Sequence, residues 1–325
     1  MDLLQTIDAI SHLIGNTPTC RLKSTNALYA KLEYYNLMGS VKDRPAYYIL
    51  RNAIRDGQID SNSTVIESTS GNFGIALAGL CKRLGLKFIP VIDPNITDEK
   101  AAILRVLSHR VVQVEERDAM GGYLLTRIEM VKELMKCTPG AFNPNQYENE
   151  DNFWAYYHSL GNEICQQFSS LDYLFVSVSS GGTITGLSRR LKEKFPRLRV
   201  IAVDIEGSLV FGDVPKARKL SGLGSSMRTP LVDKAHIDHV IILTHEQILQ
   251  GCHTLLEEQG ILGGASSGAV YMAYWLAQQK YGTAEPDATS LLIMPDNGSA
   301  YLDSIYNPQW VNKNFCQLAE SPLLL

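Results

Sequence analysis

The feature that most constrains the fold of this 325-residue chain is a regular alternation of short apolar runs with longer runs of helical periodicity. The apolar runs are nearly continuous, as expected of strands buried on both faces, and cover residues 64–67, 87–92, 110–115, 172–178, 199–204, 239–244 and 290–295. The helical runs cover residues 43–55, 73–84, 98–108, 120–136, 151–168, 183–194, 246–259 and 267–280. This alternation predicts βαβ units, and therefore an α/β fold with twisted, mostly parallel sheets flanked by helices.

Two interruptions of the alternation bear on domain organisation. The length suggests about two domains, at roughly 150 residues each. Residues 138–147 hold two Pro and one Gly and are a candidate boundary between them. Residues 205–235 lack clear periodicity and contain five Gly or Pro between Gly207 and Gly224. A loop of that length in a compact domain is usually functional.

The composition excludes several classes of protein. Hydrophobic residues make up 45% and charged residues 20%, as in ordinary globular proteins. The net charge of -4 favours neither nucleic acid nor an anionic membrane as a partner, and no run of about 18 apolar residues is present. The chain does not begin with a signal-peptide pattern, so the cytoplasm is the expected location. The six Cys form no C-x-x-C pair and the seven His are scattered, so no metal site is predicted.

Lys42 is the first candidate catalytic residue. It lies in the segment Asn36-Leu-Met-Gly-Ser-Val-Lys-Asp-Arg-Pro45, at the start of a predicted helix whose first turn accommodates Pro45. A cation beside the positive end of a helix dipole is disfavoured, which lowers the pKa of the lysine and favours the neutral amine that forms Schiff bases. The alternative is an exposed lysine that pairs with Asp43.

Three further segments lie at the ends of predicted strands. Glu67-Ser-Thr-Ser-Gly-Asn-Phe-Gly74 opens an apolar helix, and its free N–H groups and hydroxyls suit a substrate carboxylate. The alternative is a helix cap made by Ser70 or Asn72. Ser177-Val-Ser-Ser-Gly-Gly-Thr-Ile-Thr-Gly186 is rich in hydroxyls and glycine and suits a phosphate, although such turns can simply be tight. In Leu292-Ile-Met-Pro-Asp-Asn-Gly-Ser-Ala-Tyr301, Asn297 follows a strand end, where ligands bind in open sheets. The alternative is an ordinary Asn-Gly turn.

Together these segments resemble the fold-type II pyridoxal-phosphate enzymes of the cysteine synthase and cystathionine β-synthase group. Further matches are Ile14-Gly-Asn-Thr-Pro18, Lys31-Leu-Glu33 and Gly260-Ile-Leu-Gly-Gly-Ala-Ser-Ser-Gly-Ala269. The resemblance implies an enzyme that uses pyridoxal 5'-phosphate and forms a homodimer. It also implies a smaller mobile domain at residues 40–145, which carries the substrate-carboxylate loop, and a larger phosphate-binding domain at residues 1–39 and 146–325.

The same resemblance implies roles for individual residues. Lys42 would hold the cofactor as a Schiff base and act as the catalytic base at the substrate Cα. The implied cofactor-binding residues are Lys42, Asn72, Ser179, Ser180, Gly181, Gly182, Thr183, Thr185, Gly186 and Asn297. The implied substrate-binding residues are Thr69, Ser70, Gly71, Gln146, Arg127, Tyr147 and Ser179. Asn297 stands where the family usually has Ser or Thr facing the pyridine nitrogen, and it favours an uncharged ring because it cannot form an ion pair with a charged one.

One subgroup of this family resembles the chain more closely than the family as a whole: the O-phospho-L-serine-dependent N-(2-amino-2-carboxyethyl)-L-glutamate synthases. The resemblance lies in residues 118–128, 145–150 and 207–213. These enzymes supply 2,3-diaminopropionate for siderophores and peptide antibiotics. The resemblance implies a β-replacement that joins O-phospho-L-serine and L-glutamate and releases phosphate. The alternatives are a cysteine synthase using O-acetylserine or O-phosphoserine with sulfide, a serine or threonine dehydratase, and a catalytically silent protein that binds pyridoxal phosphate.

Two anionic substrates call for arginine in the site. Arg127 lies on a predicted helix next to the flexible Gly121-Gly122 pair. It is the strongest candidate because the surrounding motif matches the subgroup. The alternative is an exposed ion pair with Glu116 or Glu129. Further basic residues crowd the 205–235 loop, where simple solvent exposure is the alternative: Lys216, Arg218, Lys219 and Arg228.

Overall fold

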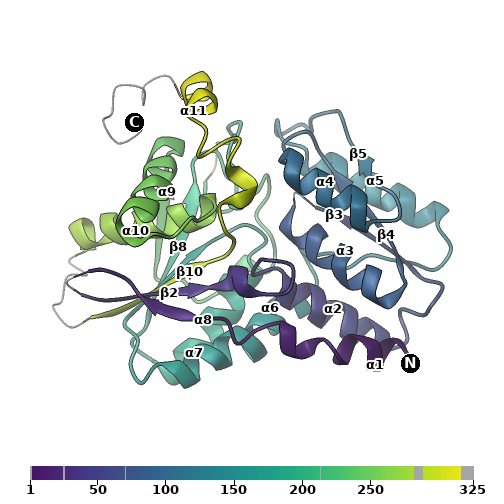
Figure 1. Ribbon diagram of the computed structural model, residues 1–325, viewed down its shortest axis with the longest axis horizontal. Coiled ribbons are helices and arrows are strands. Elements are labelled where there is room, and N and C mark those ends of the chain that lie inside the picture. Colours follow the sequence, from purple (N-terminus) through teal and green to yellow (C-terminus); the bar gives the residue numbers. More distant parts are fainter. Residues whose placement is uncertain (1, 25, 70, 213, 282–287, 316–325) are drawn as a thin grey trace.

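The computed structural model describes residues 2–24, 26–69, 71–212, 214–281 and 288–315. The strands form two sheets, one of six strands and one of four, which lie side by side in Figure 1. The predicted fold class is confirmed: both sheets are flanked by helices, and all but one pair of neighbouring strands run parallel. None of the described helices is long and apolar enough to cross a membrane.

The six-stranded sheet has the strand order β1-β2-β10-β7-β8-β9, and only β1 and β2 pair antiparallel. Its strands are β1 Thr19–Arg21, β2 Ala27–Leu32, β7 Tyr173–Ser177, β8 Arg199–Ile205, β9 His239–Leu243 and β10 Thr289–Met294. Its main helices are α6 Asp151–Tyr156, α7 Asn162–Gln167, α8 Gly182–Lys194, α9 His245–Gln259 and α10 Ala265–Tyr281. These elements are called the six-stranded half below.

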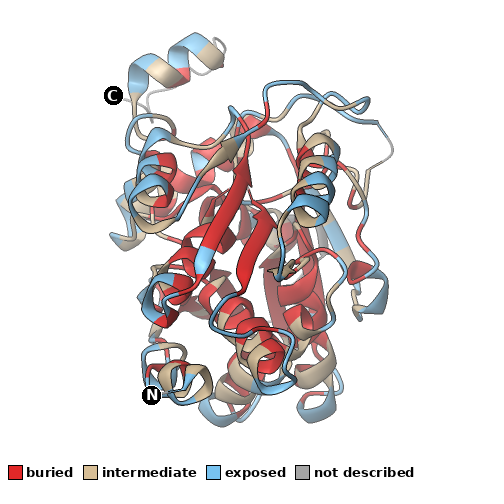
Figure 2. Cartoon of the chain, turned by 90° about the vertical axis from the view of Figure 1, so that its right-hand side faces the viewer, coloured by how far each residue is buried: buried red, intermediate tan, exposed pale blue. Residues whose placement is uncertain are grey.

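Both faces of this sheet are buried, because helices cover each of them. Along β10, Leu291 and Ile293 pack into the core with α6, α7 and α8, whereas Leu292 and Met294 pack into the core with α9 and α10. Successive side chains of a strand point to opposite faces, so a strand covered on both sides must be apolar at every position. Figure 2 shows the result, with buried strands between helices whose outer faces are exposed.

The four-stranded sheet has the strand order β5-β4-β3-β6 and is parallel throughout. Its strands are β3 Thr64–Ser68, β4 Lys87–Ile92, β5 Val112–Gln113 and β6 Ala141–Phe142. Its helices are α3 Asn72–Leu84, α4 Asp98–Leu107 and α5 Leu124–Cys137. These elements form the four-stranded half, and α2, Asp43–Arg55, joins the two halves by packing on both α3 and α6.

The structure adds elements that the sequence pattern did not predict. They are α1 Leu3–Asp8, α11 Pro308–Asn314, and the strands β1, β2 and β6. β1 and β6 are too short to show periodicity, and β2 is interrupted by the charged Lys31. The helix predicted at 151–168 is α6 and α7 joined by a π-helical turn at residues 157–161. The predicted domain ranges, 40–145 and 1–39 with 146–325, stay a prediction.

Candidate active site

A cleft opens at the carboxyl ends of the parallel strands, where ligands bind in open α/β sheets. It encloses about 1230 Å³, its open mouth included, and side chains from both halves line it. Thr69 follows β3, Asp93 follows β4 and Ser179 follows β7, so strand ends of both sheets supply its walls. A smaller cavity adjoins the cleft and shares Lys42, Asn72 and Ser179 with it.

Lys42 lies where the cleft and the smaller cavity meet, at the residue that precedes α2. Burial lowers the pKa of Lys42 to about 8, although the nearby carboxylate of Asp296 raises it. The predicted direction of this shift agrees with the structure, but the main cause is burial rather than the helix dipole. The side chain is therefore much closer to its neutral, nucleophilic form near neutral pH than an exposed lysine.

Asp43 is not the ion-pair partner of Lys42 that the alternative interpretation expected. Its buried carboxylate accepts hydrogen bonds from the backbone N–H groups of Met38, at 3.1 Å, and Ser40, at 3.0 Å. Burial raises the pKa of Asp43 to about 7, and these two N–H groups oppose that shift. The contacts fix the loop before Lys42 and leave the lysine amine directed to the cavities.

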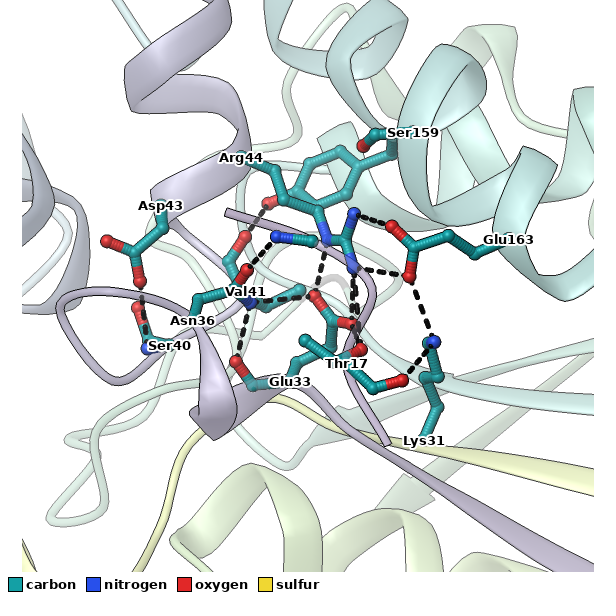
Figure 3. Close-up of polar contacts among 12 residues, drawn as sticks. Thr17, Lys31, Glu33, Asn36, Ser40, Val41, Asp43, Arg44, Ser159 and Glu163 are labelled. Atoms are coloured by element: carbon teal, nitrogen blue, oxygen red, sulfur yellow. Dashed lines mark hydrogen bonds and ion pairs between the residues drawn. The ribbon is translucent and has the colours of Figure 1, made fainter. Parts of the chain in front are cut away.

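Arg44 anchors the first turn of α2 through a buried ion network (Figure 3). Its guanidinium lies 2.6 and 2.8 Å from the carboxylate oxygens of Glu33, and 2.6 and 3.0 Å from those of Glu163. The buried Lys31 amine lies 2.9 Å from Glu163 and donates to the carbonyl of Thr17 at 2.7 Å. Each buried charge thus has an opposite partner, and Lys42 is attached to a rigid helix start.

The predicted carboxylate loop lies at the amino end of α3. The hydroxyl oxygen of the buried Thr69 accepts from the N–H groups of Gly71, at 3.1 Å, and Gly74, at 2.9 Å. Thr69 therefore takes the capping role that the alternative gave to Ser70 or Asn72, and Ser70 lies outside the described residues. Thr69, Gly71 and Gln146 all line the cleft, and the Gln146 amide donates to the carbonyl of Ser68 at 2.9 Å.

Glu67, in β3, holds this loop against the segment that contains Gln146. No role was predicted for Glu67 from the sequence. Its buried carboxylate accepts from the backbone N–H of Asn145 at 2.8 Å and from the side-chain amide of Asn143 at 3.1 Å. Burial raises the pKa of Glu67 to about 8. Glu67 thus ties β3 to the segment that presents Gln146.

The predicted phosphate loop divides into residues that face the cavities and residues that pack behind them. Ser179 lines both cavities, while Gly181 and Thr183 line the smaller one. Gly181 precedes α8 with φ +89°, and a Cβ there would lie 2.5 Å from the side chain of Val232. Only glycine suits this position, and the first N–H groups of α8 are left for a ligand.

The other residues of that loop make internal contacts. Ser180 accepts a hydrogen bond from the side chain of Asn152, and Gly182 lies against the same side chain. Thr185 is buried and donates to the carbonyl of Leu231 at 2.7 Å. A Cβ on Gly186 would lie 2.3 Å from the carbonyl oxygen of Phe153, so this glycine permits α6 and α8 to pack closely.

Asn297 lies outside the walls of both cavities. Its side-chain oxygen accepts from the N–H of Ser299 at 3.0 Å and from the hydroxyl of Ser299 at 2.7 Å. Ser266, at the start of α10, instead lines the smaller cavity with Lys42 and Asn72. Ser266 lies in the segment of residues 260–269 that resembles the family, but no role was predicted for it.

Arg127 is buried in the wall of the cleft rather than exposed with Glu116 or Glu129. Its Nε atom lies 3.1 Å from a carboxylate oxygen of Asp93, and both Nε and Nη1 lack a hydrogen-bond partner within the described residues. Tyr147 lines the same cleft, and burial raises the pKa of its phenol. Asp93 was missed in the sequence, although its place directly after β4 marks it as a candidate ligand residue.

Basic side chains dominate the cleft. Besides Lys42, they form what is called the cationic wall below: Lys100, Arg117, Arg127, Lys216, Arg218 and Lys219. Asp93 is the one acidic side chain among the described residues that line the cleft. Arg218 is held by the carbonyl groups of Gly207 and Ser225, each at 3.0 Å, so it also organises the 205–235 loop. Arg228 pairs with Asp233 and does not line the cleft.

Residues 10–296 match the family model described as pyridoxal-phosphate dependent enzyme. The chain belongs to this family. It is therefore an enzyme that uses pyridoxal phosphate, as the sequence predicted, and its class fits a transferase of the β-replacement type.

Solved structures with the same fold agree with this assignment. An O-acetylserine dependent cystathionine β-synthase from Helicobacter pylori is 33% identical, with a TM-score of 0.83, and the match covers 93% of this chain and 98% of that one. A hydrogen sulfide-producing enzyme from Fusobacterium nucleatum is 28% identical, with a TM-score of 0.81 and coverage of 91% and 99%. An O-ureido-L-serine synthase is 25% identical, with a TM-score of 0.83 and coverage of 94% and 95%.

The residues at the cleft fit the cofactor that this family requires. The amine of Lys42, with its lowered pKa, is available for a covalent bond to an aldehyde. The amino end of the 13-residue helix α8 meets the smaller cavity at Gly181, and its free N–H groups suit a phosphate. Asn72 and Ser266 place polar groups between these two points.

Proposed function

We propose that this chain joins O-phospho-L-serine and L-glutamate by β-replacement, giving N-(2-amino-2-carboxyethyl)-L-glutamate and phosphate. The observation that carries the proposal is the buried Arg127, which has two N–H-bearing atoms without a hydrogen-bond partner within the described residues. The guanidinium contacts the carboxylate of Asp93, and an anionic substrate group is the ligand that its remaining hydrogen-bond donors suit best. The product would lie on a cytoplasmic route to 2,3-diaminopropionate for a siderophore or a peptide antibiotic.

Lys42 would hold the cofactor covalently, with its phosphate beside Ser179, Gly181, Thr183 and the first N–H groups of α8. We assign the contact with the ring nitrogen to Ser266 instead of Asn297, because Ser266 lines the same cavity as Lys42. The bound cofactor supplies the electron sink that makes the substrate Cα proton acidic.

The protein groups around the substrate would then act in order. The loop of Thr69 and Gly71, with Gln146, holds the α-carboxylate, and the Lys42 amine removes the Cα proton. The bond between Cβ and the phosphate oxygen breaks, and its electron pair leaves with the phosphate, whose charge Arg127 stabilises. The amine of glutamate forms a bond to Cβ and loses one proton, and Lys42 returns a proton to Cα.

Tyr147 and Ser179 would complete the substrate contacts, since both line the cleft beside Gln146 and Arg127. Glutamate brings two carboxylates, and phosphoserine brings a carboxylate and a phosphate. The six basic side chains of the cationic wall would pair with the carboxylates and the phosphate of these two substrates.

Cysteine synthase activity is the second candidate, with O-acetylserine or O-phosphoserine and sulfide as substrates. The 33% identity with an O-acetylserine dependent enzyme favours it. The cationic wall argues against the form that uses O-acetylserine, because sulfide and a neutral acetyl ester need no cluster of basic side chains.

The proposal is tested by supplying O-phospho-L-serine with either L-glutamate or sulfide and identifying the product by mass spectrometry. The glutamate adduct should form at the higher rate. Cysteine as the main product would establish the second candidate. A keto acid with ammonia would establish a dehydratase, and no turnover with bound cofactor would establish a silent binding protein.

We also infer from the family resemblance that the chain forms a homodimer and that residues 40–145 move as a smaller domain. The cleft lies between the halves, so closing it would remove substrate from water. Light scattering gives the subunit number. X-ray scattering with and without phosphoserine should show a more compact particle when the substrate is bound, and superimposable profiles would contradict the movement.

A further inference from the structure

Asp93 places a negative charge in a cleft whose charged side chains are otherwise basic. It follows β4 directly, its side chain is buried, and no other acidic residue of the described chain lines the cleft. A carboxylate in this position repels the carboxylates and the phosphate of both proposed substrates. Asp93 therefore opposes substrate binding unless it meets a positively charged group of a substrate.

Two contacts fix the direction of the Asp93 carboxylate. Its Oδ1 atom accepts from the backbone N–H of Asn95 at 2.8 Å, and its Oδ2 atom lies 3.1 Å from the Nε atom of Arg127. An ionised carboxylate has about four lone-pair sites, so these contacts leave it able to accept from a ligand as well. Asp93 and Arg127 thus present an acceptor and hydrogen-bond donors side by side in the wall of the cleft.

The second half of the proposed reaction needs an acceptor of this kind. Free glutamate carries its amine as an ammonium near neutral pH, and an ammonium has no lone pair with which to attack Cβ. One proton must therefore leave the nitrogen before the bond to Cβ forms. Sulfide, the nucleophile of the second candidate function, has no ammonium group and needs no such step.

The other titratable groups of the cleft are less suited to take this proton. Lys42 must hold a proton at that moment, because it returns one to Cα. Burial raises the pKa of Tyr147, so its phenol keeps its proton near neutral pH. The Lys100 amine is already bound to the hydroxyl of Tyr301 at 3.0 Å. Asp93 remains as the base.

The position of Asp93 beside Arg127 also fits the order of the reaction. In a β-replacement the leaving group departs from Cβ and the nucleophile adds to the same carbon, so the two groups occupy the same space in turn. Arg127 offers donors to the departing phosphate. Asp93, in contact with Arg127, offers an acceptor to the ammonium that follows.

We propose that Asp93 is a catalytic residue that binds the ammonium group of glutamate and takes one proton from it. The nitrogen lone pair then forms the bond to Cβ, and Lys42 returns its proton to Cα. The product keeps two protons on the new secondary ammonium, and Asp93 releases its proton to water when the product leaves. This inference rests on the proposed function and adds to it the base that an amine nucleophile requires.

The experiment separates the two halves of the reaction in the holoenzyme. Phosphate released from O-phospho-L-serine in the first turnover, without a second substrate, measures the first half. The glutamate adduct formed after rapid mixing, measured by mass spectrometry, reports the second half. Asp93→Asn should leave the first rate close to that of the wild type, because an amide oxygen can still contact Asn95 and Arg127. It should lower the rate of adduct formation by about 10²- to 10⁴-fold, the contribution of a positioned base.

Two comparisons separate a catalytic role from a structural one. With sulfide in place of glutamate, Asp93→Asn should form cysteine as fast as the wild-type protein does. Asp98→Asn changes an exposed carboxylate at the start of α4 and should leave all of these rates unchanged. Equal losses of phosphate release and adduct formation in Asp93→Asn would show that Asp93 only holds Arg127, and would overturn the inference.

A second variant covers the case in which Asp93→Asn does not fold. Asp93→Glu keeps the negative charge beside Arg127 but moves the carboxylate by one methylene, so it should slow adduct formation more than phosphate release. Equal slowing of both steps would overturn the inference. A wild-type protein that releases phosphate but forms no glutamate adduct would overturn the proposed function, and the inference with it. An adduct that forms equally fast in Asp93→Asn would leave the proposed function standing and overturn the inference alone.

Discussion

Lys42, Asn72 and Ser266 line the smaller cavity and, with Asp296, are called the floor here. Within the floor, Ser266 and Asp296 are buried and hydrogen-bond each other, whereas at the cationic wall the side chains of Arg117, Lys216 and Lys219 are exposed. Lys100 and Arg127 are the buried members of the wall, and two nitrogen atoms of Arg127 have no hydrogen-bond partner within the described residues. The floor is thus internally satisfied, while the wall has donors left for a ligand. Chemistry at the cofactor needs fixed geometry, and recognition of an anionic substrate needs hydrogen-bond donors that the protein has not itself satisfied.

The largest expected effect concerns the floor. Lys42→Ala should abolish the visible absorbance of covalently bound cofactor, because the described chain brings no other amine to the junction of the two cavities. Absorbance of the purified variant, with mass spectrometry after borohydride reduction, checks this. Lys132→Ala, an exposed change on α5, is the control and should retain the absorbance. An intact cofactor adduct in Lys42→Ala would refute the placement.

The next effect concerns the ion network that anchors the floor. Arg44→Ala leaves Glu33 buried without its partner, and breaking a buried pair in this way costs about 3–5 kcal/mol in the free energy of unfolding. Arg55→Ala breaks the exposed pair with Asp56 and should leave the free energy of unfolding nearly unchanged, because water screens exposed ion pairs. Denaturant unfolding of both holoenzyme variants gives the comparison. Equal losses would mean that the network does not hold the start of α2.

The cationic wall is tested by Arg127→Ala, which should keep bound cofactor but lose turnover of phosphoserine. A hydrogen bond to a charged group is worth about 1.5–3 kcal/mol, which corresponds to about a 10- to 150-fold loss in kcat/KM. Arg127→Lys should rescue only part of the loss, because an ammonium cannot make the paired contacts of a guanidinium. Unchanged kcat/KM for phosphoserine would contradict this role. A loss that depends only on glutamate would move Arg127 to the second substrate.

A smaller effect follows from the pKa of Lys42. Burial lowers that pKa from 10.5 to about 8, and the neutral amine is the form that attacks the cofactor aldehyde. The rate at which cofactor-free protein takes up pyridoxal phosphate should therefore rise with pH through about 8 and level off above it. Absorbance after rapid mixing measures the rate. A rate that continues to rise toward pH 10.5 would show that the lysine is not perturbed.

More of the residues of the floor than of the cationic wall could be placed from the sequence. Lys42 and the loop at residues 69–72 lie directly beside strand or helix ends, where short-range rules apply. The contact between Ser266 and Asp296 was missed because it depends on how α10 and β10 meet, and no local pattern records that. Asn297 was chosen as the first polar side chain expected beyond the strand, yet its amide turns to Ser299.

For Arg127, the sequence predicted the secondary structure but not the tertiary contact. Its helix was predicted, but not its burial against Asp93, which comes from the end of β4 some thirty residues earlier in the chain. Contacts of that kind depend on the order of strands in the sheet. The sequence therefore suggested an anion-binding role for Arg127, while its burial in the cleft wall and its contact with Asp93 became visible only in three dimensions.

The most direct test of the account is a competition between leaving groups. The enzyme is given equal amounts of O-phospho-L-serine and O-acetyl-L-serine with L-glutamate, and released phosphate and acetate are both measured. The account predicts that phosphate is released in excess, and that the excess falls in Arg127→Ala while the control Lys132→Ala retains it. Acetate in excess in the wild-type protein would contradict the claim that the cationic wall selects a phosphorylated substrate.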